Sequence, residues 1–131
     1  DVFIGVSGVK NLLTLKMIKN MNKDPIIFAL TNPLPEINPK LAKKAGARII
    51  ATGSYMYHNK VNNALVFPHL MRVILDMRIK KIGLDLLLLT SKAIAKTVTD
   101  RELDYEHIIP EIMNKKLQKN ITLALSKFAP K

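Results

Sequence analysis

Three asparagine side chains are the residues in this sequence best suited to binding a ligand. Asn32 follows the apolar run 26–30, and Asn62 and Asn63 follow the apolar run 47–51 after a polar loop. An amide offers a hydrogen-bond donor and an acceptor, so two such groups could bind a carboxamide and a carboxylate together. A simple Asn-Pro turn is the alternative for Asn32, and spacing alone does not separate the two interpretations.

A run of small residues ends the first apolar segment, where Gly5, Val6 and Ser7 precede Gly8. The sequence contains no GxGxxG pattern, so this run does not indicate a phosphate-binding loop. Small residues would let a ligand approach the backbone closely. A plain turn between a strand and a helix explains the composition equally well.

Other residue types that could do chemistry lack the spacing that chemistry needs. The three histidines show no metal-site spacing, so we expect structural or surface roles for His58, His69 and His107. A solvated charge run is preferred over a metal site for Glu102, Asp104 and Glu106. No Ser-His-Asp arrangement can be assembled. We therefore expect neither catalytic residues nor metal ligands within this chain.

The elements that must position the asparagines alternate between strand and helix. Apolar runs bounded by turn residues predict strands over residues 1–7, 25–31 and 47–53, of the kind buried in parallel sheets. Amphipathic spacing predicts a helix over residues 11–21. Asn38 as N-cap, Pro39 at the first helical position and Gly46 at C′ predict a second, short helix.

This βαβαβ order predicts an α/β fold, half of a Rossmann-like doubly wound parallel sheet with right-handed crossovers. Ligands bind such sheets at the carboxyl ends of their strands, where the three asparagines are expected. The chain should turn helical from Val61, with Pro68 dividing a short turn from a longer helix, and further helices are predicted over residues 83–99 and 111–128. We expect residues 1–78 to form the sheet-containing part of the domain and residues 79–131 its helical segment.

Length and composition are those of a single globular domain. The chain has 131 residues, 48% of them hydrophobic, and no cysteine, which excludes disulfides and fits the cytoplasm. No apolar run approaches the roughly 18 residues of a membrane span, and the first residues lack the basic region of a signal peptide. The chain starts without Met inside an expected strand, so we expect a piece of a longer protein.

The charge balance is strongly basic, with a formal net charge of +11 and a pI near 10.0. Such a balance raises the case for nucleic acid or another polyanion as a ligand. The lysines are dispersed, however, and aromatic residues make up only 5% of the chain. Solvated helix faces are therefore preferred over nucleic-acid binding.

Four segments together resemble the NAD(P)-binding domain of malic enzymes, most closely the bacterial and archaeal branch. They read DVFIGVS at 1–7, DPIIFALTNP at 24–33, AGARIIATG at 45–53 and VNNALVFP at 61–68, and residues 72, 75–78 and 105–110 continue the match. The resemblance covers nearly the whole chain in order. It identifies the predicted half-sheet as the C-terminal half of the domain.

The resemblance implies oxidative decarboxylation of malate to pyruvate and CO2, with NAD or NADP taking the hydride and Mg²⁺ or Mn²⁺ as the metal. It implies cofactor-binding roles for Gly5, Val6, Ser7, Asn32 and Asn62. Substrate-binding roles are implied for Asn32 and Asn63. It places the catalytic residues, the metal ligands and the Gly-rich pyrophosphate loop upstream of residue 1.

Three departures from the family pattern lie at the ligand edge. His69 stands where the family usually has glycine, in the loop 54–58 only a tyrosine of the usual sequence is kept, and the turn after Ser7 is longer by one residue. The half-sheet should also present an open edge, through which we expect the isolated chain to aggregate or dimerise. A basic polyanion-binding module and an inactive remnant of the family are the alternative functions.

Overall fold

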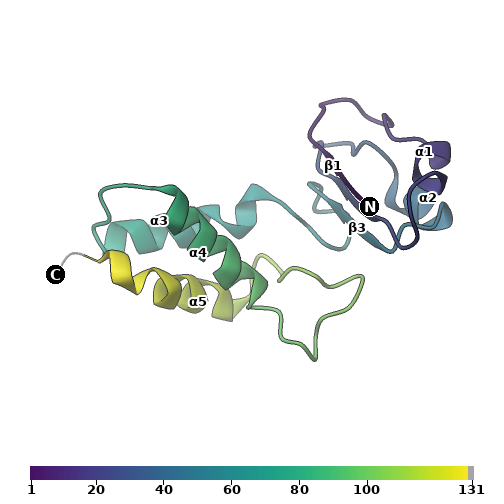
Figure 1. Cartoon of the computed structure of the whole chain (residues 1–131). Helices are drawn as coiled ribbons and strands as arrows, with labels where there is room; N and C mark the ends of the chain where they lie inside the picture. The colour runs from purple at the N-terminus through teal and green to yellow at the C-terminus, as the bar shows by residue number, and fades with distance from the viewer. Residues whose placement is uncertain (130–131) are drawn as a thin grey trace. The chain divides into compact units, whose positions relative to one another are not determined.

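The computed structural model describes residues 1–129. The chain divides into two compact units, each drawn in Figure 1. Unit 1 comprises residues 1–62 and 104–107, and unit 2 comprises residues 63–103 and 108–131. The boundary between the compact units thus falls earlier than the predicted division at residue 78, which concerned one domain of a complete protein and stays a prediction.

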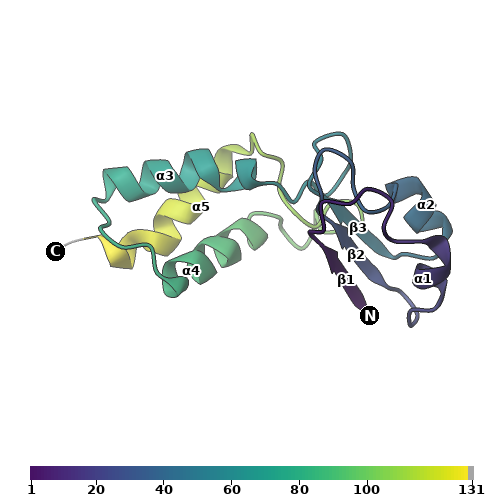
Figure 2. The same cartoon turned by 90° about the horizontal axis from the view of Figure 1, so that it is seen from above.

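Unit 1 is built on a three-stranded parallel sheet, visible in Figure 2. The strands β1 (Val2–Gly5), β2 (Ile26–Ala29) and β3 (Ile49–Thr52) lie in the order β1-β2-β3. Sequential order with parallel strands confirms the predicted α/β class. Each strand has four residues and is shorter than the range predicted for it.

Two helices of unit 1 pack on one face of this sheet. Buried residues of α1 (Leu15–Lys19), α2 (Pro39–Lys44) and β2 form a single core together with residues of the segments beside them: Leu13, Ile18, Ile27, Ala29, Ile37, Ala42 and Ala47. The opposite face differs, because Val2 and Ile4 of β1 are 59% and 63% exposed. At β1, one face of the sheet is therefore packed against the core, and the opposite face is exposed to solvent.

The first helix is shorter than predicted, and the second is as predicted. A helix over residues 11–21 is wrong: Asn11 has a φ of 57°, and Thr14 caps a helix that begins at Leu15 by accepting from the Met17 N–H. Asn38 does accept from the Lys40 N–H at the start of α2. Gly46 has a φ of 105°, in the region where glycine carries no Cβ penalty.

Unit 2 is helical throughout its regular structure. A 3-10 turn, η1 (Asn63–Leu65), leads into α3 (Phe67–Asp76), which is followed by α4 (Leu84–Ala95), α5 (Lys115–Leu125) and a last turn, η2 (Ser126–Phe128). The predicted helix over residues 83–99 is too long, because its end is capped at Lys96. The last helix begins later than the predicted residue 111, at Lys115, because the Asn114 side chain caps it by accepting from the Lys116 N–H.

One apolar core holds the helices of unit 2 together. Its fully buried members come from η1, α3, α4 and α5, and include Leu86, Leu117, Ile121 and Leu125 at 0% exposure. Pro68 lies in the first turn of α3, where its missing N–H leaves no bond unmade. A short turn and a longer helix occur as predicted, but they divide at Val66, and Pro68 lies inside the helix that it was predicted to precede.

Gly53 gives a test of how tightly the ends of β2 and β3 are joined. A Cβ at Gly53 would lie 2.5 Å from the backbone oxygen of Leu30, which cannot rotate away. We expect Gly53→Ala to lower the free energy of unfolding by about 2–4 kcal/mol, measured by urea unfolding. Gly83→Ala is the matched control, because a Cβ there meets nothing within 4 Å and should cost less than about 1 kcal/mol. Equal effects of the two substitutions would contradict this packing.

Candidate functional site

The carboxyl ends of β1 and β2 form one edge of unit 1, and the predicted cofactor residues Gly5, Val6 and Ser7 lie there. Gly5 pairs in register with Ala29, and the Leu30 N–H donates to the Gly5 carbonyl at 2.9 Å. Gly5 is buried, and Val6 is 77% exposed. The side chain of Val6 is thus accessible to a ligand, whereas the backbone carbonyl of Gly5 is already hydrogen-bonded to β2.

The absence of a side chain at Gly5 makes room for another residue of the protein. A Cβ at Gly5 would lie 2.6 Å from Cδ of Glu36. The space that a side chain would need is therefore occupied by the Glu36 carboxyl group. This packing explains the glycine without a ligand, and the cofactor role of Gly5 stays a prediction.

Ser7 is engaged by the same carboxylate. Its N–H and its hydroxyl both donate to Glu36 Oε1, each at 3.0 Å. The hydroxyl oxygen also accepts from the Val9 N–H at 3.1 Å. Ser7 therefore shapes the turn after β1 through bonds within the protein, and its direct contact with a cofactor stays a prediction.

Glu36 is a fully buried carboxylate, with 0% exposure. Besides Ser7 it accepts hydrogen bonds from the Thr31 N–H, at 3.1 Å, and from the Thr31 hydroxyl. Burial raises the pKa of the Glu36 carboxyl, but the hydrogen bonds from Thr31 and Ser7 and from its own backbone outweigh that effect and lower the pKa from 4.5 to about 2. The side chain is thus an anion held between two neighbouring strand ends.

Asn32 lies directly after Thr31 at the end of β2, where the sequence predicted it. Its residue is exposed, and the Asn32-Pro33 peptide bond is cis. Within residues 1–129 its side-chain amide makes no hydrogen bond. A donor and an acceptor are therefore presented at the carboxyl edge of the sheet, which suits the binding of a polar ligand.

The two adjacent asparagines differ in what their side chains do. Asn62 is half-buried, and its Nδ2 donates to the Gly53 carbonyl at 2.6 Å, which closes the loop after β3. Asn63 begins η1, its residue is exposed, and its side chain makes no hydrogen bond in the described part of the chain. Asn62 thus has a structural bond that sequence patterns do not predict, whereas the amide of Asn63 is available to a ligand.

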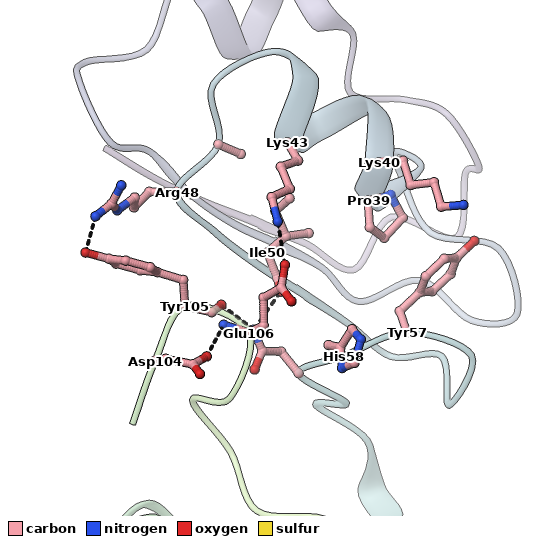
Figure 3. A pocket seen from close by; sticks show the side chains of 12 residues that line it. Pro39, Lys40, Lys43, Arg48, Ile50, Tyr57, His58, Asp104, Tyr105 and Glu106 are labelled. Carbon is pink, nitrogen blue, oxygen red and sulfur yellow. Dashed lines mark hydrogen bonds and ion pairs between the residues drawn. The ribbon is translucent and has the colours of Figure 1, made fainter. Parts of the chain in front are cut away.

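A separate cavity of about 630 Å³ lies in unit 1 beside α2 and β3 and is shown in Figure 3. Two of its basic residues, Lys43 and Arg48, already have partners. Lys43 pairs with Glu106, and Arg48 donates to the Tyr105 hydroxyl and lies 3.7 Å from the centre of its ring. Asn59 donates to the carbonyls of Ile50 and Tyr105. These contacts hold the segment 104–107 against the sheet, so the cavity has a structural explanation without an anionic ligand.

The acidic residues Glu102, Asp104 and Glu106 are exposed, as a solvated charge run predicts, and each also bonds to a neighbouring group. Glu102 accepts from the Thr99 N–H and hydroxyl, and Asp104 accepts from the Glu106 N–H at 2.7 Å. The pKa of the Glu106 carboxyl is lowered by the hydrogen bond and the charge of Lys43. His69 lies near the Ile112 carbonyl, with 3.3 Å between Nε2 and the oxygen. No group of three metal-ligating side chains occurs among residues 1–129.

None of the helices in residues 1–129 has the length and apolar character needed to cross a bilayer.

Glu36 is the site residue that sequence reasoning missed. It stands in a proline-rich loop, where an acidic residue is normally solvated. The available signal was its position, four residues beyond Asn32 at the carboxyl edge of a predicted parallel sheet. Its burial depends on donors from Ser7, 29 residues away in the sequence, which no local pattern reveals.

Comparison with known proteins gives one consistent family. The sequence profile described as "Malic enzyme, NAD binding domain" matches residues 1–129. The chain is 43% identical over 125 residues to the NAD-dependent malic enzyme of Geobacillus stearothermophilus, covering 95% of this chain and 26% of that protein. It is 38% identical over 144 aligned positions to the NADP-dependent malic enzyme of Escherichia coli, covering 98% of this chain and 19% of that protein.

A solved structure has the same fold. The crystal structure of the NAD-dependent malic enzyme from Thermotoga maritima aligns with a TM-score of 0.86 at 45% identity, over 95% of this chain and 32% of that one. The chain therefore spans about a third or less of the length of each of these relatives.

The depressed pKa of Glu36 predicts a pH dependence of stability. A carboxyl whose pKa is about 2 when folded and about 4.5 when unfolded stabilises the protein fully above pH 4.5, and this contribution is lost as the pH falls toward 2. The shift corresponds to about 3 kcal/mol. Urea unfolding of the wild type and Glu36→Gln should therefore differ most above pH 5 and converge as the pH falls to about 2. A difference that stays constant over this range would contradict the assignment.

Proposed function

The chain belongs to the malic enzyme family, as part of its NAD-binding domain, and on this premise we propose that it serves an enzyme that oxidatively decarboxylates malate to pyruvate and CO2. The family match over residues 1–129 carries the proposal. The exposed, unpartnered amide of Asn32 at the carboxyl end of a parallel strand supports it, because this is where α/β sheets bind ligands. NAD or NADP, when bound, takes the hydride from C2 of malate.

In this proposal the residues of the chain bind and orient, and do not themselves carry out bond breaking. The turn of Gly5, Val6 and Ser7 lines the cofactor together with Asn32 and Asn62. Asn32 and Asn63 present amides to the substrate, where a donor and an acceptor can hold a carboxylate or a carboxamide. Fixing malate against the nicotinamide in this way supplies part of the barrier reduction through orientation.

The metal is proposed to be bound by other parts of the complete protein. Residues 1–129 offer no group of three metal-ligating side chains, so no Mg²⁺ or Mn²⁺ ligand is assigned here. The relatives named above include both an NAD-dependent and an NADP-dependent enzyme, and the proposal accordingly covers either dinucleotide. We further propose a homodimeric, cytoplasmic enzyme.

The alternative of a polyanion-binding module has less support. Its motive is the net charge of +11. The family membership accounts for the fold and for the asparagines, neither of which a polyanion-binding module requires. Several of the basic residues also have protein partners, as Lys43 and Arg48 do.

Substitution of the asparagines tests the proposed site in the complete protein. We expect Asn32→Ala and Asn63→Ala each to lower kcat/KM for malate by about ten- to a hundredfold, since each leaves a ligand group unpaired at a cost of about 1–3 kcal/mol. Thermal unfolding should change little, because neither side chain makes a hydrogen bond within residues 1–129. Asn62→Ala is the contrasting variant and should also lose stability, because it removes the bond to Gly53. Wild-type kinetics in both Asn32→Ala and Asn63→Ala would contradict the site.

The division of labour within the complete protein gives a second test. Residues 1–131 alone should not oxidise malate, because malate oxidation needs a base for the hydroxyl proton and a metal to stabilise the enolate. The assay follows reduced dinucleotide at 340 nm with malate, Mn²⁺ and either NAD or NADP. Turnover by the isolated chain would place the base and the metal ligands within it and overturn this part of the proposal.

A further inference from the structure

The buried carboxylate of Glu36 is a charged group for which the proposed reaction has no direct use. It is 0% exposed and accepts four hydrogen bonds, two from Ser7 and two from Thr31. The donors come from the turns after two neighbouring parallel strands, β1 and β2. A buried carboxylate is costly unless its oxygens are fully bonded, so this geometry resists displacement of either turn.

The network extends beyond the carboxylate. The Thr31 hydroxyl accepts from the Gly8 N–H at 3.0 Å while it donates to Glu36, so it links both turns at one atom. The backbone carbonyl of Glu36 accepts from the Leu13 N–H at 2.9 Å. Glu36 thus fixes the segment from Ser7 to Leu13 through both its side chain and its main chain.

The network also determines which polar groups remain for a ligand. It uses the inward-facing donors of Ser7, Gly8 and Thr31 within the protein. Asn32 is covalently next to the fixed Thr31, yet its own amide stays exposed and unpartnered among residues 1–129. Because the backbone next to Asn32 is already fixed, less conformational entropy is lost when a ligand binds to its amide.

We propose that Glu36 is a positioning residue, which holds the turn after β1 and the turn that carries Asn32 in the relative geometry that binds the dinucleotide. This inference rests on the proposed function, because it assigns the supporting network of the same site. Glu36 itself contacts neither cofactor nor substrate in this assignment. It acts through Thr31 on Asn32 and through Ser7 on the turn after β1.

The test uses the complete protein and measures dinucleotide affinity directly, by titration with NAD and with NADP in the absence of malate and metal. Glu36→Gln puts an NH2 group against N–H or O–H donors of Ser7 and Thr31, and should raise the Kd of the dinucleotide about tenfold at a temperature where the variant is folded. Glu102→Gln is the matched control. Glu102 likewise accepts from a threonine N–H and hydroxyl, at Thr99 in unit 2, and its substitution should leave the Kd unchanged.

A double-mutant cycle separates positioning from general stability. Because Glu36 positions both Asn32 and the turn after β1, Glu36→Gln should weaken binding by about threefold rather than tenfold in the Asn32→Ala background, where one of the two positioned groups is already gone. The same tenfold loss in both backgrounds, or an unchanged Kd in Glu36→Gln alone, overturns the inference. A lowered Tm with an unchanged Kd would also overturn the inference, because it would show a role in stability alone.

A second pair of variants covers the case in which Glu36→Gln does not fold. Thr31→Val removes the hydroxyl that links both turns at nearly constant volume, and Thr31→Ser keeps that hydroxyl. We expect weaker dinucleotide binding in Thr31→Val and near wild-type binding in Thr31→Ser, and equal Kd values in the two overturn the inference. If the wild-type protein itself binds neither NAD nor NADP, the proposed function fails first. Wild-type binding that is insensitive to both Glu36 and Thr31 defeats only the positioning role.

Discussion

The burial of one negative charge, the Glu36 carboxylate, constrains the ligand edge of unit 1. A carboxylate removed from water is tolerated only when its oxygens accept enough hydrogen bonds, and Glu36 obtains them from Ser7 and Thr31. Those donors follow two different strands, so the bonds can form only with β1 and β2 in their observed register. Gly5 completes the arrangement, since any larger residue would enter the space of the carboxyl group.

The parallel sheet sets the frame in which this charge can be buried. Parallel neighbours bring their carboxyl ends to one edge, and the short crossovers through α1 and α2 return the chain over the covered face. The turns that leave β1 and β2 are therefore adjacent, although they are far apart in sequence. This adjacency lets a single side chain from the loop after β2 hold both turns.

Much of this frame could be predicted from the sequence, because it depends on local patterns. The apolar runs specified three strands, and Asn38, Pro39 and Gly46 specified the ends of α2. Helix lengths were overestimated where a polar cap overrode the apolar spacing, as Thr14 does at the start of α1. The burial of Glu36 could not be predicted, because its donors come from residues up to 29 positions away and its class of residue is normally exposed.

The asparagines show the same limit on a smaller scale. The pair at 62 and 63 looks equivalent in sequence, yet Asn62 donates to the Gly53 carbonyl while Asn63 leaves its amide exposed at the start of η1. Composition identifies which residues can bind a ligand, and the hydrogen bonds decide which are already committed to the fold. By this criterion Ser7 and Asn62 act first on the loops that they close. Asn32 and Asn63 retain donors and acceptors for a ligand, and Glu36 fixes the turn from which Asn32 projects.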